Sequence, residues 1–302
     1  MKKQIILLFM YAVTAYTTTA QQNSNLALAP VGDHYKDLQQ YSAAVNLQRV
    51  WMDTIKYPPA EYGNSITFLL VKPYYLSPDQ VSALSKSVNP PANSSDQVRK
   101  ELDYLLDLQT KRTAEQIKRV EFLGDIGYWP QINLLPTHDS YNQNLKDLFF
   151  EGRELLGDNV NAKNFPAISK LLQGVMQDMR IMEFTIKYKL LRPRPYHLEP
   201  TLSPLTRINS PSFASGHTLW AFIQAFTWAQ IIPEKQNDFI ILAEEIRRSR
   251  EIMGIHFPSD NEASRQVAYK MTQFYWKNPV FQKDLKNAIQ EWNSKRNTIL
   301  AK

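Results

Sequence analysis

With 302 residues, 43% hydrophobic content and 12% aromatic residues, the chain is long and apolar enough to bury a large core, which excludes a disordered protein. Its net charge of +6 is mild, and without a basic stripe or block it does not indicate a nucleic-acid-binding protein. Cysteine is absent, which excludes disulfides, thiol nucleophiles and a lipid anchor on cysteine.

The first 20 residues have the pattern of a secretory signal peptide. Lys2 and Lys3 precede the apolar run Ile5–Met10, and small and polar residues then lead to Ala20. A membrane anchor, the alternative, needs about 20 apolar residues to cross a bilayer, and this run is shorter. We therefore expect cleavage near Ala20 and a periplasmic or secreted mature protein without a membrane span. Removal of Lys2 and Lys3 from a net charge of +6 leaves +4.

The N-terminal part of the mature chain is polar and gives few structural signals. Residues 21–65 form an extension of uncertain structure, with one short helix expected between residues 36 and 55. Further on, Ser77 is placed to cap a helix whose first turn contains Pro78. We place the main domain at residues 66–302.

Helical spacing of apolar residues dominates the rest of the chain. Residues 94–122 predict an amphipathic helix that is broken near Lys111, with Ser95 or Asp96 as its cap. Residues 165–191 have an apolar face so wide that they predict a buried, central helix. Further helices are expected over residues 142–156, 215–232, 234–253, 260–275 and 279–295, with loops over 124–139 and 203–213. No hairpin signal and no sustained period-two segment appears, so the sequence predicts an all-α fold.

Three basic residues are candidates for binding a phosphoryl group. The charge of such a group lies on its oxygens, which positioned cations and backbone donors stabilise. Lys187 lies near the end of the predicted buried helix, Arg194 is held between Pro193 and Pro195, and Arg250 can offer two parallel N–H groups. Each residue alone is equally consistent with solvated surface, because the chain has 35 lysines and arginines.

Ser215, Gly216 and His217 lie where a loop becomes a helix. The first turn of a helix has unpaired N–H groups and the positive end of the helix dipole, and Gly216 allows close approach of a ligand to the backbone. His217 would then be placed to protonate a leaving alkoxide as a general acid. The alternative for Ser215 is an ordinary helix cap.

His256 and Asp260 form a second candidate pair. If one turn presents both, the carboxylate can accept the proton of one ring nitrogen and leave the other nitrogen as a nucleophile towards phosphorus. The alternative is a structural histidine beside an aspartate that caps a helix. Together with the basic residues and His217, the pair predicts a phosphate-ester hydrolase.

Three segments of the chain resemble the three-part signature of the type 2 phosphatidic acid phosphatase and vanadium haloperoxidase superfamily, in order and in spacing. The segments are Lys187-x6-Arg194-Pro195, Ala214-Ser215-Gly216-His217 and Ser249-Arg250-x5-His256-x3-Asp260. Within the superfamily the chain is most similar to the bacterial class A non-specific acid phosphatases, from about residue 72 to residue 281. One departure is Ala214, where the family usually has proline.

The resemblance implies a secreted enzyme with a single helical-bundle domain that needs neither a metal nor a cofactor. It also implies a role for each matching residue. Phosphate oxygens are bound by Lys187, Arg194 and Arg250, with further donors from Ser215 and Gly216; His217 protonates the leaving group, and His256, oriented by Asp260, attacks to form a phosphohistidine.

The leading hypothesis is therefore a secreted acid phosphatase of broad specificity for small phosphate monoesters. Alternatives on the same scaffold are a soluble lipid-phosphate or pyrophosphate phosphatase, or a vanadium-dependent haloperoxidase in which the position of His256 binds vanadate. A phosphate-binding protein without turnover is a further alternative. The sequence leaves open the physiological substrate, phosphotransferase activity, a homo-oligomeric state and the role of residues 21–65.

Overall fold

The computed structural model describes residues 32–127 and 136–300. Within these two ranges every regular element is a helix, so the prediction of an all-α fold is confirmed. The predicted signal peptide lies outside the described residues. No helix in the described ranges is both long and apolar enough to cross a membrane.

The described residues form α-helices and short 3₁₀ helices. In the N-terminal half they are α2 (Asp33–Leu38), η1 (Leu47–Thr54), η2 (Pro59–Glu61), η3 (Asn64–Leu70), α3 (Pro78–Lys86), α4 (Asp96–Lys111), α5 (Ala114–Asp125), α6 (Tyr141–Leu148) and α7 (Phe150–Leu156). In the C-terminal half they are α8 (Pro166–Leu190), α9 (Pro195–Leu198), α10 (Gly216–Ile231), η5 (Pro233–Lys235), α11 (Gln236–Ile252), α12 (Pro258–Tyr275) and α13 (Pro279–Leu300).

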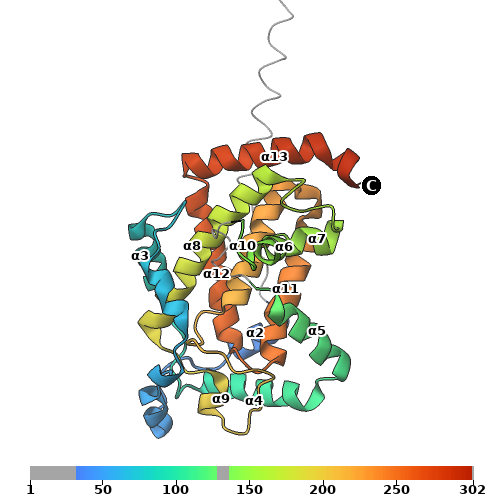
Figure 1. The fold of residues 1–302 in the computed structure, drawn as a ribbon. Coiled ribbons are helices and arrows are strands. Elements are labelled where there is room, and N and C mark those ends of the chain that lie inside the picture. The colour runs from blue at the N-terminus through green and yellow to red at the C-terminus, as the bar shows by residue number, and fades with distance from the viewer. Residues whose placement is uncertain (1–31, 128–135, 301–302) are drawn as a thin grey trace, which may run out of the picture.

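The core of the molecule is built around α10. This helix packs against α8, α11 and α12, and its residues from Thr218 to Ile231 are all buried, including Trp220 and Trp228. A helix that is apolar on every side must be enclosed by other helices. The predicted burial of α8 is confirmed as well. Helix α13 crosses one end of this bundle, and α4 and α9 lie at the opposite end (Figure 1).

Several predicted helix boundaries are confirmed by the capping contacts. Ser77 accepts a hydrogen bond from the backbone of Gln80 at the start of α3, and Ser95 caps α4. The predicted break near Lys111 separates α4 from α5, which begins with Thr113 as its cap. Short polar side chains that bond to the first free N–H groups stabilise such helix starts.

The short helix expected between residues 36 and 55 is wrong as one continuous element. Helix α2 ends at Leu38, and η1 begins only at Leu47. Between them, the carbonyls of Ser42 and Ala43 accept hydrogen bonds from the backbone near the start of α4, at 3.0 and 3.1 Å. This tertiary pairing replaces the local hydrogen bonds that a continuous helix would need.

The N-terminal extension packs directly on the main domain. The backbone N–H of Tyr57 donates to the carbonyl of Leu191 at 2.8 Å, and that of Gly63 donates to the carbonyl of Asn209 at 2.9 Å. The expected domain boundary at residue 66 falls inside η3, which begins at Asn64. Phe68 of η3 stacks on a phenylalanine of α8, with 5.2 Å between the ring centroids.

Candidate active site

Six of the eight predicted site residues line one cavity of about 600 Å³. They come from α8, from the loop before α9, from the start of α10, from the end of α11 and from the turn before α12. The six residues are Lys187, Arg194, Gly216, His217, Arg250 and His256. The other two, Ser215 and Asp260, lie behind this wall. Segments up to 69 residues apart in the sequence thus meet at one place.

Two backbone features bring these segments together. Helix α8 ends at Leu190. The next residue, Leu191, has a left-handed conformation with φ of 51°, and the chain then turns towards Arg194. After α11 the chain reverses at Gly254, whose φ of 71° lies in the region that glycine adopts without strain. This reversal presents His256 just before α12 begins.

Among the described residues, four cations line the cavity: Arg180 and the three predicted ones. The three predicted cations are buried and are held by backbone carbonyls. Lys187 donates through Nζ to the carbonyl of Pro211, and Arg194 donates through Nε to the carbonyl of Ser210 at 2.9 Å. Arg250 donates through Nη2 to a carbonyl of α5 at 3.2 Å. Burial, and secondly the charge of Arg194, lower the pKa of Lys187 to about 7. Such a group of cations in low dielectric favours an anion as its partner.

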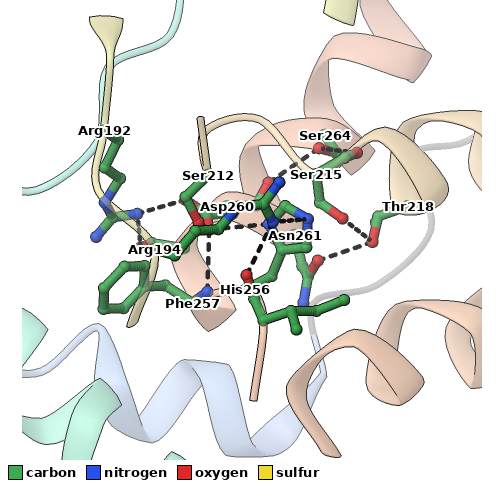
Figure 2. Close-up of polar contacts among 12 residues, drawn as sticks. Arg192, Arg194, Ser212, Ser215, Thr218, His256, Phe257, Asp260, Asn261 and Ser264 are labelled. Carbon is green, nitrogen blue, oxygen red and sulfur yellow. Dashed lines mark hydrogen bonds and ion pairs between the residues drawn. The ribbon is translucent and has the colours of Figure 1, made fainter. Parts of the chain in front are cut away.

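His256 is held in one defined tautomer. Its Nδ1 lies 3.1 Å from Oδ2 of Asp260, and its Nε2 lies 2.8 Å from Nη1 of Arg194 (Figure 2). A guanidinium can only donate, so Nε2 must accept, and the ring proton lies on Nδ1 and is donated to Asp260. Burial, followed by the charge of Arg194, lowers the pKa of His256 well below its usual value. The ring is therefore neutral, with a lone pair on Nε2.

The span of the chain that carries these residues matches a known family. Residues 167–283 match the sequence profile of the PAP2 superfamily, and all eight predicted site residues lie within this span. The match covers 117 of the 302 residues, and we refer to this matching span as the PAP2 domain. The resemblance to this superfamily is thereby confirmed.

Relatives of this PAP2 domain include bacterial phosphatases. A non-specific acid phosphatase of Providencia stuartii is 28% identical over 190 residues, which cover 59% of this chain and 77% of the relative. A non-specific acid phosphatase of Salmonella typhi is 28% identical over 151 residues, which cover 48% of this chain and 60% of the relative. The chain thus spans less than two thirds of the Salmonella protein.

Among solved structures, the chain is similar to a bacterial vanadium-dependent iodoperoxidase. The TM-score is 0.52 with 18% sequence identity, over 72% of this chain and 59% of the other. At this level of identity the similarity shows a shared fold. Among the described residues, no group of three or more histidine, aspartate or glutamate side chains is arranged to hold a metal ion.

Asp260 lies at the centre of the polar network behind the cavity of the PAP2 domain (Figure 2). Its Oδ2 accepts hydrogen bonds from Oγ of Ser212 at 2.5 Å, from the backbone of Phe257 at 3.0 Å and from His256. Its Oδ1 accepts one from Nη1 of Arg192 at 2.6 Å. Burial alone would raise the pKa of Asp260, but Arg192 and these hydrogen bonds lower it well below the usual range. Asp260 is therefore a carboxylate whose position is fixed by four donors.

Arg192 and Glu101 support Asp260, and neither residue was predicted from the sequence. Arg192 is buried over the ring of Phe257, 4.0 Å from its centroid, and donates to Oγ of Ser259 at 2.9 Å. Ser259 donates in turn to Glu101 through its backbone at 3.0 Å and its hydroxyl at 2.8 Å. Burial raises the pKa of Glu101 to about 7, against the opposing effect of Arg192. The network thus connects α4 to the site in the PAP2 domain.

A signal for Glu101 was present in the sequence. Val98, Leu102 and Leu105 define the buried face of α4, and Glu101 lies on that face, three residues after Val98. A carboxylate on an apolar helix face needs a buried partner. For Arg192 the signal was weaker, because it precedes a proline just as Arg194 does, and nothing in the sequence separates the roles of the two arginines.

His217 lies at the rim of the cavity next to the end of α5. Its Nε2 lies 3.2 Å from the carbonyl oxygen of Gly124, so Nε2 carries the ring proton. Burial, then the charges of Arg250 and Arg180 and of His256, lower the pKa of His217 well below its usual value. Both imidazoles of the cavity are therefore neutral as the structure stands.

The hydroxyl of Ser215 does not reach the cavity, and it does not cap α10. It donates to Oγ1 of Thr218 at 3.0 Å, and Thr218 donates to Asn261 of α12 at 2.8 Å. The carbonyl of Ser215 accepts from Oγ of Ser264 at 2.8 Å. The side chain and carbonyl of Ser215 thus connect α10 to α12, a role that differs from both predicted alternatives.

Proposed function

We propose that this chain is a secreted acid phosphatase that hydrolyses small phosphate monoesters through a phosphohistidine on His256. The observation that carries the proposal is the state of His256, whose Nδ1 proton is bound by Asp260 and whose Nε2 lone pair points towards Arg194 at the cavity. The names of the Providencia and Salmonella relatives support the substrate class. The PAP2 match supports a phosphatase of this superfamily.

In the first half-reaction, Lys187, Arg194 and Arg250 bind the phosphate oxygens. Arg194 transfers its Nη1–H contact from His256 to an oxygen, which frees the Nε2 lone pair for attack in line with the ester oxygen. The Nε2–P bond forms as the P–O ester bond breaks. Asp260 accepts the hydrogen bond from Nδ1–H of His256 throughout and compensates the positive charge that develops on the imidazole ring.

His217 supplies the proton to the leaving oxygen. Burial and the nearby positive charges keep His217 neutral in the free cavity. A bound phosphate compensates these charges, which raises the pKa of His217 and allows the ring to take up a second proton in acid. After the alcohol leaves, neutral His217 accepts a proton from a water molecule as that water attacks phosphorus. The Nε2–P bond breaks, inorganic phosphate is released, and His256 returns to its starting state.

The electrostatics of the cavity favour this reaction in acid. His256 has a lowered pKa because of burial and Arg194, so it stays an unprotonated nucleophile at acidic pH. Lys187, with a pKa of about 7, is charged below neutrality and loses its charge above it. We expect activity between about pH 4 and 7 and a decline at higher pH.

The test is rapid-quench reaction with labelled p-nitrophenyl phosphate. The native protein should release nitrophenol and form a base-stable, acid-labile phosphoryl adduct, and His256→Asn should abolish both. His138→Asn is the matched control because His138 is exposed and does not line the cavity. Absence of turnover in the native protein, or an adduct that persists in His256→Asn, would overturn the proposal.

The same preparation separates the alternatives. Vanadate is also a tetrahedral oxyanion, and Lys187, Arg194, Arg250 and His256 would hold it in the same cavity, where it would supply peroxide activation. Bromide oxidation with added vanadate and peroxide, without phosphatase turnover, would therefore favour a haloperoxidase. Profiling with lipid phosphates and pyrophosphate identifies the leaving group, and a pure binding protein would show ligand binding without turnover.

We also propose that residues 1–20 are a cleaved signal peptide and that residues 66–302 form the phosphatase domain. The charge and hydropathy pattern of the first residues supports export. N-terminal sequencing of the protein from the periplasm should begin near Gln21. An intact Met1 on the exported protein would contradict this part of the proposal.

A further inference from the structure

The cavity for anions contains a carboxylate. Glu183 lies one turn before Lys187 on α8 and lines the same cavity, with 6% of its side chain exposed. Its Oε2 accepts a hydrogen bond from Nη1 of Arg180 at 2.8 Å. Its Oε1 lies 3.9 Å from Nζ of Lys187. A buried negative group beside the cations weakens the attraction for a general anion, so its presence needs a separate reason.

The carboxylate of Glu183 occupies the space that glycine leaves free at the start of α10. A Cβ atom on Gly216 would lie 2.1 Å from Oε1 of Glu183 and 2.5 Å from its Cδ. Gly216 is the first residue of α10, where the unpaired N–H groups attract an anion. Glu183 therefore lies against the helix end at which an oxyanion is expected to bind.

The groups around Glu183 favour binding of an oxyanion only when one of its oxygens carries a proton. Arg180 and Lys187 face the carboxylate from α8, and Arg194 acts on it from the loop before α9. These residues supply donors to an oxyanion, whereas Glu183 supplies an acceptor. An unprotonated ligand oxygen next to Oε1 of Glu183 would place two hydrogen-bond acceptors together, and their negative charges would repel each other. An oxygen that carries a proton would donate a short, charge-assisted hydrogen bond to Oε1.

We infer that Glu183 is a specificity-determining residue that makes this site bind oxyanions carrying a proton, such as the monoanion of a phosphate ester, and reject unprotonated oxyanions such as sulfate. The inference rests on the proposed phosphatase function and specifies the form of the phosphoryl group that the site accepts. Phosphate monoesters lose their second proton with a pKa near 6. The monoanion therefore predominates in the acidic range where His256 and Lys187 are in their reactive states.

The test uses two probes of equal charge, shape and size. At pH 5, methylphosphonate and methanesulfonate are both tetrahedral monoanions with one methyl group, but only methylphosphonate has an O–H group. Titration calorimetry with the native protein should show that methylphosphonate binds about 100-fold more tightly, since sites built around a donor reject the analogue that lacks it by at least this factor. This comparison needs no variant.

Glu183→Gln should reduce the preference to less than about tenfold, because the amide can donate to the sulfonate. Glu121→Gln is the matched control: Glu121 lines the same cavity but is exposed, and its variant should keep the native ratio. Equal binding of the two probes by the native protein, no binding of methylphosphonate, or an unchanged ratio in folded Glu183→Gln would overturn the inference. None of these results decides whether p-nitrophenyl phosphate is hydrolysed, so failure of the inference and failure of the proposed function are distinguishable.

Discussion

Replacement of Asp260 by asparagine tests the network behind His256. The carboxylate accepts from three donors on Oδ2 and from Arg192 on Oδ1. An asparagine side chain has one acceptor oxygen and one donor NH₂ group, so on one side of the network the NH₂ group must face a group that also donates. The orientation that keeps three hydrogen bonds places the amide oxygen towards His256 and the NH₂ group towards Arg192, and we expect this orientation.

The expected cost follows from this geometry. Arg192, buried and 2.6 Å from Oδ1 in the native protein, loses its closest negative partner, and the breaking of a buried ion pair costs about 3–5 kcal/mol. The tautomer of His256 is retained, but its developing positive charge is no longer compensated. We expect kcat to fall by about 10²–10³, the range for loss of one preorganised electrostatic contact.

The assay is urea unfolding of Asp260→Asn, Arg192→Met and the double variant, with kcat measured on the same samples. If the donor conflict causes the instability, Asp260→Asn should be much less destabilising in the Arg192→Met background, with a coupling energy of about 2 kcal/mol or more. Equal destabilisation in both backgrounds would refute the reasoning. A fully active Asp260→Asn would refute the role assigned to its charge.

Three further predictions concern the cavity and its turns. Burial and then Arg194 lower the pKa of Lys187 to about 7, so its charge is present below that pH and lost above it. Lys187→Arg keeps the charge and should shift the alkaline decline of kcat/KM to higher pH; an unchanged pH profile would contradict this. Gly216→Ala should cost about 1–3 kcal/mol of stability in urea unfolding through its clash with Glu183, and Glu183→Ala in the same chain should recover most of that loss. Gly254→Ala should lower stability by about 1–2 kcal/mol for its left-handed backbone alone, since no atom lies within 3.4 Å of the added carbon; a neutral effect in thermal unfolding would count against this.

The helices were predictable because local signals define them. Ser77 and Ser95 are cap residues at the points where apolar spacing begins, and the structure uses both as caps. The separate pieces α2 and η1 were not predictable, because contacts of residues 42 and 43 with the start of α4, about 50 residues away, separate them. Local periodicity contains no information on such pairing.

Six of the residues that line the cavity were predictable from the motifs, whereas the residues that support them were not. Arg194 and His256 belong to recognisable spacings, and the structure brings them to 2.8 Å. The direction of the Ser215 hydroxyl depends on Thr218 and on α12, and residue type alone does not define a side-chain rotamer. Glu183 lies in none of the three motifs, and the structure identifies it by its place in the cavity, beside Lys187 and against the first residue of α10.

Helix η3 supplies a part of the cavity wall that lies outside the PAP2 match. Ser65 and Phe68 line the cavity, yet η3 lies about 100 residues before the PAP2 match, whose span carries all the proposed reacting groups. Mutations in this segment can therefore reshape what fits beside the bound phosphate while leaving the chemistry intact. The range of substrates and the chemistry can thus change independently, because different parts of the chain supply them.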